Sequence, residues 1–187
     1  MIASGTFRLI PGLVLLLGLL SATTVRAAGF EVRSASTYLS GNVYHLNAVI
    51  KYRFSKAALD ALSNGVPLVI ELRMGVRHRR SFMWDKTIFS LSQRFELSYH
   101  PLSQQYLVTN LNSGERHGFP SLALASKFMG DLHDFPFLDK GLLPSGKGFI
   151  GALQARLDLE SLPAPLRLFA YISEDWHLSS KWYTWLL

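Results

Sequence analysis

Residues 68–76 read LVIELRMGV, a stretch in which every second side chain is apolar. The apolar positions are Leu68, Ile70, Leu72, Met74 and Val76. A repeat of two is that of a β-strand, because successive side chains of a strand point to opposite faces. One face of this strand is therefore expected to meet a core and the other to meet water, as in an antiparallel sheet covered on one side.

The same alternation recurs along the chain. It is clear in residues 42–54, 94–99 and 149–159, and weaker in residues 30–39, 105–111, 166–172 and 178–187. Turn residues separate these runs at 40–42, 101–103 and 112–114. Seven or eight short strands with such turns predict a mainly β protein, an antiparallel two-sheet β-sandwich that is Ig-like in general shape.

Two short helices are expected to interrupt the strands. Ser55 is a good N-cap for the sequence KAALDALSN, and Gly65 follows as a stop. Ser121 precedes LALASKFM, and Gly130 ends it. The next segment, residues 131–147, is rich in Pro, Gly and Asp and predicts a long irregular loop.

A small outer-membrane β-barrel is the alternative architecture, and the aromatic residues Trp182, Tyr183 and Trp185 near the C-terminus fit it. A barrel needs about ten residues per strand and an unbroken lipid-facing apolar row. The two helices and the Pro-containing connections break that order, so the sandwich is preferred.

The N-terminus has the pattern of a secretory signal peptide. Arg8 precedes the apolar run LIPGLVLLLGLL at residues 9–20, and the small residues Val25 and Ala27 precede a suitable cleavage position. A membrane span needs about 20 apolar residues, so a retained anchor is the less favoured alternative. We expect residues 1–27 to be removed, leaving one domain at residues 28–187 in the periplasm with no stable transmembrane segment.

The composition excludes several kinds of chemistry. The chain has no cysteine, which rules out thiol catalysis, zinc-thiolate sites and iron–sulfur clusters. Cleavage would remove Arg8 and Arg26 from the 19 basic residues and none of the 13 acidic ones. The mild positive charge that remains does not indicate nucleic acid, but it suits an anionic envelope component.

No catalytic motif is present in the sequence. Asp131, His133, Asp134 and Asp139 form the one acid-rich neighbourhood with a histidine, and such a stretch is more often solvated than metal-binding. We therefore predict no metal and no cofactor. A non-catalytic protein is the first hypothesis, and an envelope hydrolase with a non-standard site is the alternative.

A basic strip is the most distinctive polar feature. Arg73, Arg77 and Arg79 would lie on one face of an extended strand, with same-face neighbours roughly 6.6 Å apart. Lys51 and Arg53 would lie on the outer face of a neighbouring strand. These five residues are the candidate site for a phosphate, a carboxylate or an acidic partner, although a merely solvated outer face has the same pattern.

Tryptophans crowd the C-terminal region at Trp176, Trp182 and Trp185. They predict either the packing of a terminal strand or an aromatic-lined groove for a peptide or glycan.

Three stretches carry a resemblance to a known family: AALDALSNGVPLVIELRM, RFELSYHPLSQQYLVTNLNSGE and LPAPLRLFAYISEDWHLSSKWYTWLL. They resemble the proteobacterial family of unknown function DUF4390 over nearly the whole mature chain. The resemblance implies an exported envelope protein whose gene often lies beside that of a membrane sensor kinase of the nitrogen-regulation type. No catalytic residues are assigned in that family. The sandwich-like pattern, the basic strip and the lack of a catalytic motif favour a periplasmic, non-catalytic binding or interaction protein with an envelope protein as its partner. The resemblance adds the expectation that it is accessory to such a kinase.

Overall fold

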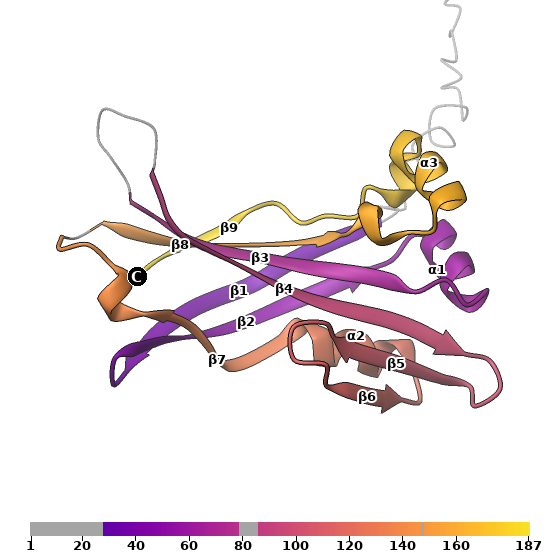
Figure 1. Cartoon of the computed structure of the whole chain (residues 1–187), viewed down its shortest axis with the longest axis horizontal. Helices are drawn as coiled ribbons and strands as arrows, with labels where there is room; N and C mark the ends of the chain where they lie inside the picture. The colour runs from indigo at the N-terminus through magenta and orange to yellow at the C-terminus, as the bar shows by residue number, and fades with distance from the viewer. Residues whose placement is uncertain (1–27, 79–85, 147) are drawn as a thin grey trace, which may run out of the picture.

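Two antiparallel sheets make up most of the chain in the computed structural model, which describes residues 28–78, 86–146 and 148–187 (Figure 1). The smaller sheet has the order β1-β2-β7, with bounds Gly29–Ser40, Val43–Arg53 and Asp131–Asp139. The larger has the order β6-β5-β4-β3-β8-β9, with bounds Arg116–Phe119, Gln105–Asn110, Lys86–His100, Leu68–His78, Phe149–Leu157 and Tyr183–Leu186. The predicted mainly β, antiparallel two-sheet sandwich is confirmed.

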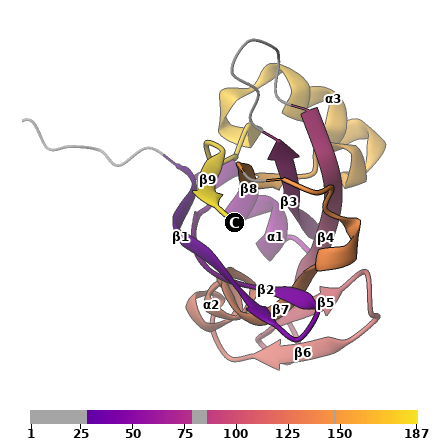
Figure 2. The same ribbon diagram turned by 90° about the vertical axis from the view of Figure 1, so that its left-hand side faces the viewer.

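The core lies between the two sheets, which face each other in the view of Figure 2. The five apolar positions of β3 identified from the alternation are all buried. The smaller sheet contributes Leu46, Ala48 and Ile50 from alternate positions of β2. Strand alternation therefore decides the fold, because one face of each sheet excludes water while the other remains polar.

The turns between the strands are where the sequence places them. Ser40 pairs with Val43 across the β1–β2 hairpin, and Gly41 at its tip has a positive φ of 61°. Gly114, in the connection from β5 to β6, also has a positive φ. Glycine adopts this conformation without strain.

Three α-helices occur in the described part of the chain: α1 (Lys56–Ser63), α2 (Leu122–Gly130) and α3 (Ala164–Ile172). The two predicted helices are α1 and α2, with Ser55 and Ser121 as their N-caps. Both hydroxyl oxygens accept a hydrogen bond from the backbone N–H three residues later. The described residues also contain three short 3₁₀ turns, η2 (Lys140–Leu142), η3 (Leu159–Ser161) and η4 (Glu174–Trp176).

Replacing Ser55 by Ala is expected to destabilise the protein by about 1 kcal/mol, because the buried hydroxyl oxygen satisfies the Ala58 N–H at 3.2 Å. Urea unfolding followed by circular dichroism measures the change. Ser63→Ala is the control, since its exposed hydroxyl only donates to Asp60 O within the last helical turn. Equal effects of both substitutions would contradict the capping role.

The predicted loop at residues 131–147 is wrong in its first half. Asp131–Asp139 forms β7, which pairs with β2 and completes the smaller sheet. Two irregularities in this pairing accommodate residues that break the alternation, including Asp134, whose φ is +50°. Pro136 is tolerated because β7 is an edge strand and needs hydrogen bonds on one side only.

The weak strand predicted at residues 166–172 is also wrong, since this segment lies in α3. Pro165 occupies the first helical turn, where a missing N–H is harmless. The edge of the larger sheet beside β8 is occupied instead by β9.

None of the helices that the structure describes has the length and apolar character needed to cross a bilayer.

Candidate functional site

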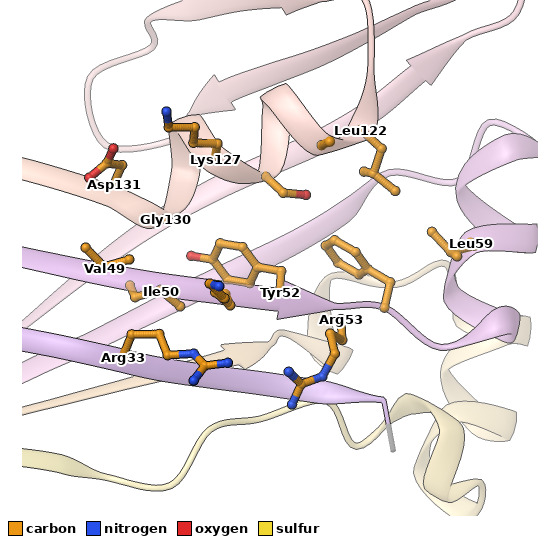
Figure 3. Close-up of a pocket in the computed structure, with 14 residues that line it drawn as sticks. Arg33, Val49, Ile50, Tyr52, Arg53, Leu59, Leu122, Lys127, Gly130 and Asp131 are labelled. Atoms are coloured by element: carbon orange, nitrogen blue, oxygen red, sulfur yellow. The ribbon is translucent and has the colours of Figure 1, made fainter. Parts of the chain in front are cut away.

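A groove of about 870 Å³ runs between β2 and α2 (Figure 3). Its walls are largely apolar, and its volume is in the range of ligand-binding pockets. The apolar part comes from β2, the residue that follows it, α1 and α2: Ile50, Tyr52, Phe54, Leu59 and Leu122. Such a concave, apolar surface with charged residues around it is the usual form of a binding site.

The groove exists because α2 lies very close to β2 at one end. A Cβ atom placed on Gly130 would come within 2.2 Å of the Ile50 carbonyl oxygen and 3.1 Å of the Tyr52 ring. Only glycine permits this approach of helix to strand. From Gly130 the helix leads back toward Leu122, which faces Leu59 of α1 across the groove.

The groove follows the edge of β2 rather than one face of the sheet. Residues 49–53 all line it, although alternate side chains of a strand point to opposite faces. The last described pair between β2 and β7 is Val49 with Asp131. Beyond that pair, β2 continues to Arg53 with β1 on one side and the groove on the other. None of the described strands therefore pairs with the edge of β2 where the groove lies.

Positive charge surrounds the groove. Arg33 and Arg53 share a single carboxylate, that of Glu31, at 3.1 and 3.3 Å. The Nε atom of Arg53 is buried and has no hydrogen-bond partner among the residues that the structure describes. Lys51 and Lys127 also line the groove, and no ion pair involving either occurs in the described part of the chain. An anionic group entering the groove would meet a surplus of cationic side chains.

Two groups in the groove are already satisfied within the protein. The Asp131 carboxylate has the His133 Nε2 atom as its neighbour at 2.8 Å. The Tyr52 hydroxyl donates to the Met129 carbonyl oxygen at 3.3 Å, and burial raises the pKa of this phenol well above its usual value. Tyr52 is therefore neutral and presents an apolar ring to the groove.

The predicted basic strip is divided between two places. Arg73 and Arg77 lie on the outer face of the larger sheet, on the same side of β3 as expected. Lys51 and Arg53 are not on a neighbouring strand, because β2 belongs to the smaller sheet, and they lie at the groove instead. Arg79 falls outside the described residues.

Trp182 joins Arg73 and Arg77 on the outer face. The guanidinium carbons of the two arginines lie 5.6 and 5.1 Å from the centre of its ring, which is cation–π geometry. A hollow of about 400 Å³ adjoins these three side chains. The expectation that C-terminal tryptophans only pin a strand does not describe Trp182, which is exposed.

An ion pair on the same face joins β8 to β3. The Arg156 Nε donates to Glu71 Oε2 at 2.5 Å, and Ser92 Oγ donates to the other carboxylate oxygen at 2.7 Å. Burial alone would raise the pKa of Glu71. The hydrogen bonds from Ser92 and Arg156 and the charges of Arg156 and Arg73 outweigh burial and lower that pKa.

The lowered pKa of Glu71 predicts an acid-dependent loss of stability. The carboxylate stabilises the folded state fully above its unfolded pKa of about 4.5, and this contribution disappears as the pH falls through the lower folded value. We expect the unfolding free energy to fall less between pH 5 and about pH 3 in Glu71→Gln than in the unmodified chain, as measured by urea unfolding at each pH. Glu96→Gln, which removes a carboxylate without an ion pair in the described chain, should retain the steeper fall.

A smaller hollow beside η3 brings Asp158, Glu160 and His177 to one surface. Asp158 accepts from Arg94 at 2.5 Å through one oxygen and from the Glu160 N–H through the other. Glu160 accepts from the Tyr171 hydroxyl. Both carboxylates are thus engaged in structural hydrogen bonds, and no acid–base pair is assigned here.

The acid-rich stretch considered as a metal site is dispersed along β7. Asp134 accepts from Tyr38 at 2.7 Å, and Asp139 accepts from Asn42 at 2.7 Å. No group of three or more potential metal ligands gathers anywhere in residues 28–78, 86–146 or 148–187.

The outer side of α3 exposes three large apolar side chains. Leu168, Phe169 and Ile172 are 73%, 66% and 82% exposed. Contiguous exposed apolar surface of this kind is unusual on an isolated protein.

The groove was missed by reasoning from the sequence. Its walls come from β1, β2, α1, α2 and the start of β7, which are distant in the chain. The one local signal is Gly130, which ends α2. The strand β7 begins at the next residue, Asp131, so this glycine is not needed for a turn.

These features define an antiparallel two-sheet β protein with a cationic groove at a strand edge and a second, arginine-rich hollow on the opposite sheet. The chain belongs to the family described as a domain of unknown function (DUF4390), whose family model matches residues 27–186. Neither the curated proteins nor the solved structures contain a match.

Proposed function

We propose that this protein is an exported, non-catalytic interaction protein of the periplasm that binds an acidic, partly apolar segment of an envelope protein in the groove. The single observation that carries the proposal is the 870 Å³ apolar groove beside the edge of β2 that no described strand pairs with, with Arg33, Lys51, Arg53 and Lys127 lining it.

The segment would add to the smaller sheet as an extra strand. The pairing of β7 with β2 stops at Asp131. An extended peptide beside Tyr52 and Phe54 would pair with the next part of the same edge of β2. In this mode main-chain hydrogen bonds supply affinity, and pockets for alternate side chains supply specificity. Apolar side chains of the segment would contact Leu59 and Leu122, and its carboxylates would contact the surrounding cations.

Export is supported by the N-terminal sequence, in which the apolar run at residues 9–20 is followed by Val25 and Ala27. The resemblance to the family supports a membrane sensor kinase as the class of partner. Osmotic-shock fractionation of expressing cells, with N-terminal sequencing of the released protein, tests this part. A mature chain beginning at Ala28 in the periplasmic fraction is expected, and a full-length chain retained in the membrane fraction would contradict it.

The binding site is tested with a displayed library of random, unstructured peptides panned against residues 28–187. We expect the enriched peptides to alternate apolar residues with Asp or Glu. A synthetic enriched peptide should bind the Lys51→Glu variant at least tenfold more weakly, since charge-assisted hydrogen bonds contribute about 1.5–3 kcal/mol each, as measured by isothermal titration calorimetry.

Lys140→Glu is the matched control, because it makes the same change of charge at a distant place. Lys140 lies in η2, at the other end of the molecule from α1 (Figure 1). It should leave the affinity within twofold. Enriched peptides without acidic residues, or equal losses in the two variants, would contradict the proposed groove site.

A further inference from the structure

The outer face of the larger sheet carries a second arrangement of polar and aromatic groups that the groove does not use. Arg73 and Arg77 both approach Trp182, which is itself 39% exposed. The three side chains border a hollow of about 400 Å³ between β3 and β4. This volume is in the range of small-ligand pockets.

The two guanidinium groups have donors to spare. The guanidinium carbons lie 5.6 and 5.1 Å from the centre of the Trp182 ring, and each group carries five N–H donors that this contact does not use as hydrogen bonds. Neither Arg73 nor Arg77 has an ion pair or a side-chain hydrogen bond in the part of the chain that the structure describes. Guanidinium groups in this state bind carboxylate or phosphate through two parallel hydrogen bonds.

The charge of the hollow remains positive. Glu71 also lines it, but the carboxylate of Glu71 is already paired with Arg156 and with Ser92. Arg73 also interacts electrostatically with Glu71, but the one carboxylate is outnumbered by Arg73, Arg77 and Arg156, so an incoming anion meets a net positive charge.

The floor of the hollow is formed by small and hydroxyl-bearing residues. Gly75 lies between the two arginines along β3, and a Cβ atom there would come within 2.7 Å of the Phe89 carbonyl oxygen. Ala152 leaves room beside it, and Ser90 and Thr87 add hydroxyl groups. A flat ring can thus approach the sheet closely and still find hydrogen-bond partners.

An exposed indole, hydroxyl groups and unpaired guanidinium groups together suit one class of ligand. We propose that this hollow binds an acidic sugar, whose carboxylate or phosphate is held by Arg73 and Arg77 and whose ring lies against Trp182. Hydroxyl groups of the sugar would exchange hydrogen bonds with Ser90 and Thr87. The site is independent of the groove and of the peptide proposed to bind there.

The experiment titrates residues 28–187 with two probes, tri-galacturonate and glucose 1-phosphate, which carry a carboxylate and a phosphate on the same kind of ring. Nuclear magnetic resonance of the tryptophan indole N–H signals reports binding, and Trp182→Phe assigns the Trp182 signal by its loss. We expect at least one probe to shift the Trp182 signal, and Arg77→Gln or Arg73→Gln to weaken that binding at least tenfold.

Three comparisons decide the result. Arg116→Gln, an exposed arginine of β6 outside the hollow, should leave the affinity within twofold. Neutral maltotriose should bind at least tenfold more weakly than the better acidic probe. Inorganic phosphate that binds as tightly as glucose 1-phosphate, neutral sugar that binds as tightly as the acidic one, or no shift of the Trp182 signal with either acidic probe would each overturn the proposal.

Discussion

Gly130→Ala is expected to destabilise the protein by about 2–3 kcal/mol and to lower Tm by about 4–12 °C. The added methyl group would lie 2.2 Å from the Ile50 carbonyl oxygen, which belongs to the β2 backbone and is held by the pairing of Ile50 with Val32 of β1. Alanine favours a helix over glycine by up to about 1 kcal/mol. The two effects have opposite signs, so the measured sign shows which one dominates.

Urea unfolding and calorimetry of the two chains measure this difference. Gly118→Ala is the control, because its new methyl group would meet only the Gln105 and Leu107 side chains, at 3.4 and 3.5 Å. That substitution should change the unfolding free energy by less than about 0.5 kcal/mol. A stabilised Gly130→Ala protein would show that α2 does not approach β2 as described.

The same substitution bears on the proposed binding site. Because Gly130 fixes the end of α2 against β2, a displaced helix would change the width of the groove and the position of Lys127. Peptide binding should therefore weaken in Gly130→Ala even at temperatures where the protein remains folded. The acidic-sugar site on the other sheet should keep its affinity, since it contains no residue of α2.

Sequence patterns predict those parts of the fold that depend on near neighbours in the chain. A repeat of two identifies β3 and β2, and a hydroxyl before an apolar run identifies α1 and α2. The patterns fail where the secondary structure of a segment depends on the strand with which it pairs. Asp131–Asp139 has the composition of a loop, yet it becomes a strand because β2 offers it an edge.

The helix α3 shows the opposite failure. The weak alternation of its apolar residues suggested a strand. In the structure, however, β9 occupies the edge of the sheet beside β8. Pro165 then begins a helix in the space that remains, and that helix leaves Leu168, Phe169 and Ile172 exposed. The one local signal for this helix is Pro165, because proline is favoured in the first turn of a helix.

The candidate site is partly predictable for the same reason. Arg73 and Arg77 share a face because side chains four residues apart in a strand point the same way. The prediction that Lys51 and Arg53 lie beside these arginines required β2 and β3 to be neighbours in one sheet. They belong to different sheets, and the pattern of one strand does not indicate its neighbours. Trp182 reaches the two arginines from more than one hundred residues further along the chain, which alternation cannot indicate.

Leu72→Ala should lose about 2–5 kcal/mol of unfolding free energy, whereas Arg73→Ala, the very next position, should lose less than about 1 kcal/mol. Leu72 is fully buried between the sheets, so its truncation leaves a cavity as well as lost apolar burial. Arg73 lies on the exposed outer face, where its contact with Trp182 contributes little to folding.

Urea unfolding of both variants at pH 7 measures this difference in stability. The affinity for the acidic sugar should show the reverse order. Arg73→Ala should bind the sugar more weakly, and Leu72→Ala, where it remains folded, should bind it with unchanged affinity. Equal losses of stability at the two positions would mean that the faces of β3 are not divided between core and solvent. If stability depends on Leu72 and sugar binding on Arg73, alternate residues of the single strand β3 serve the two purposes. Its inner face holds the sandwich together, and its outer face is left free to bind.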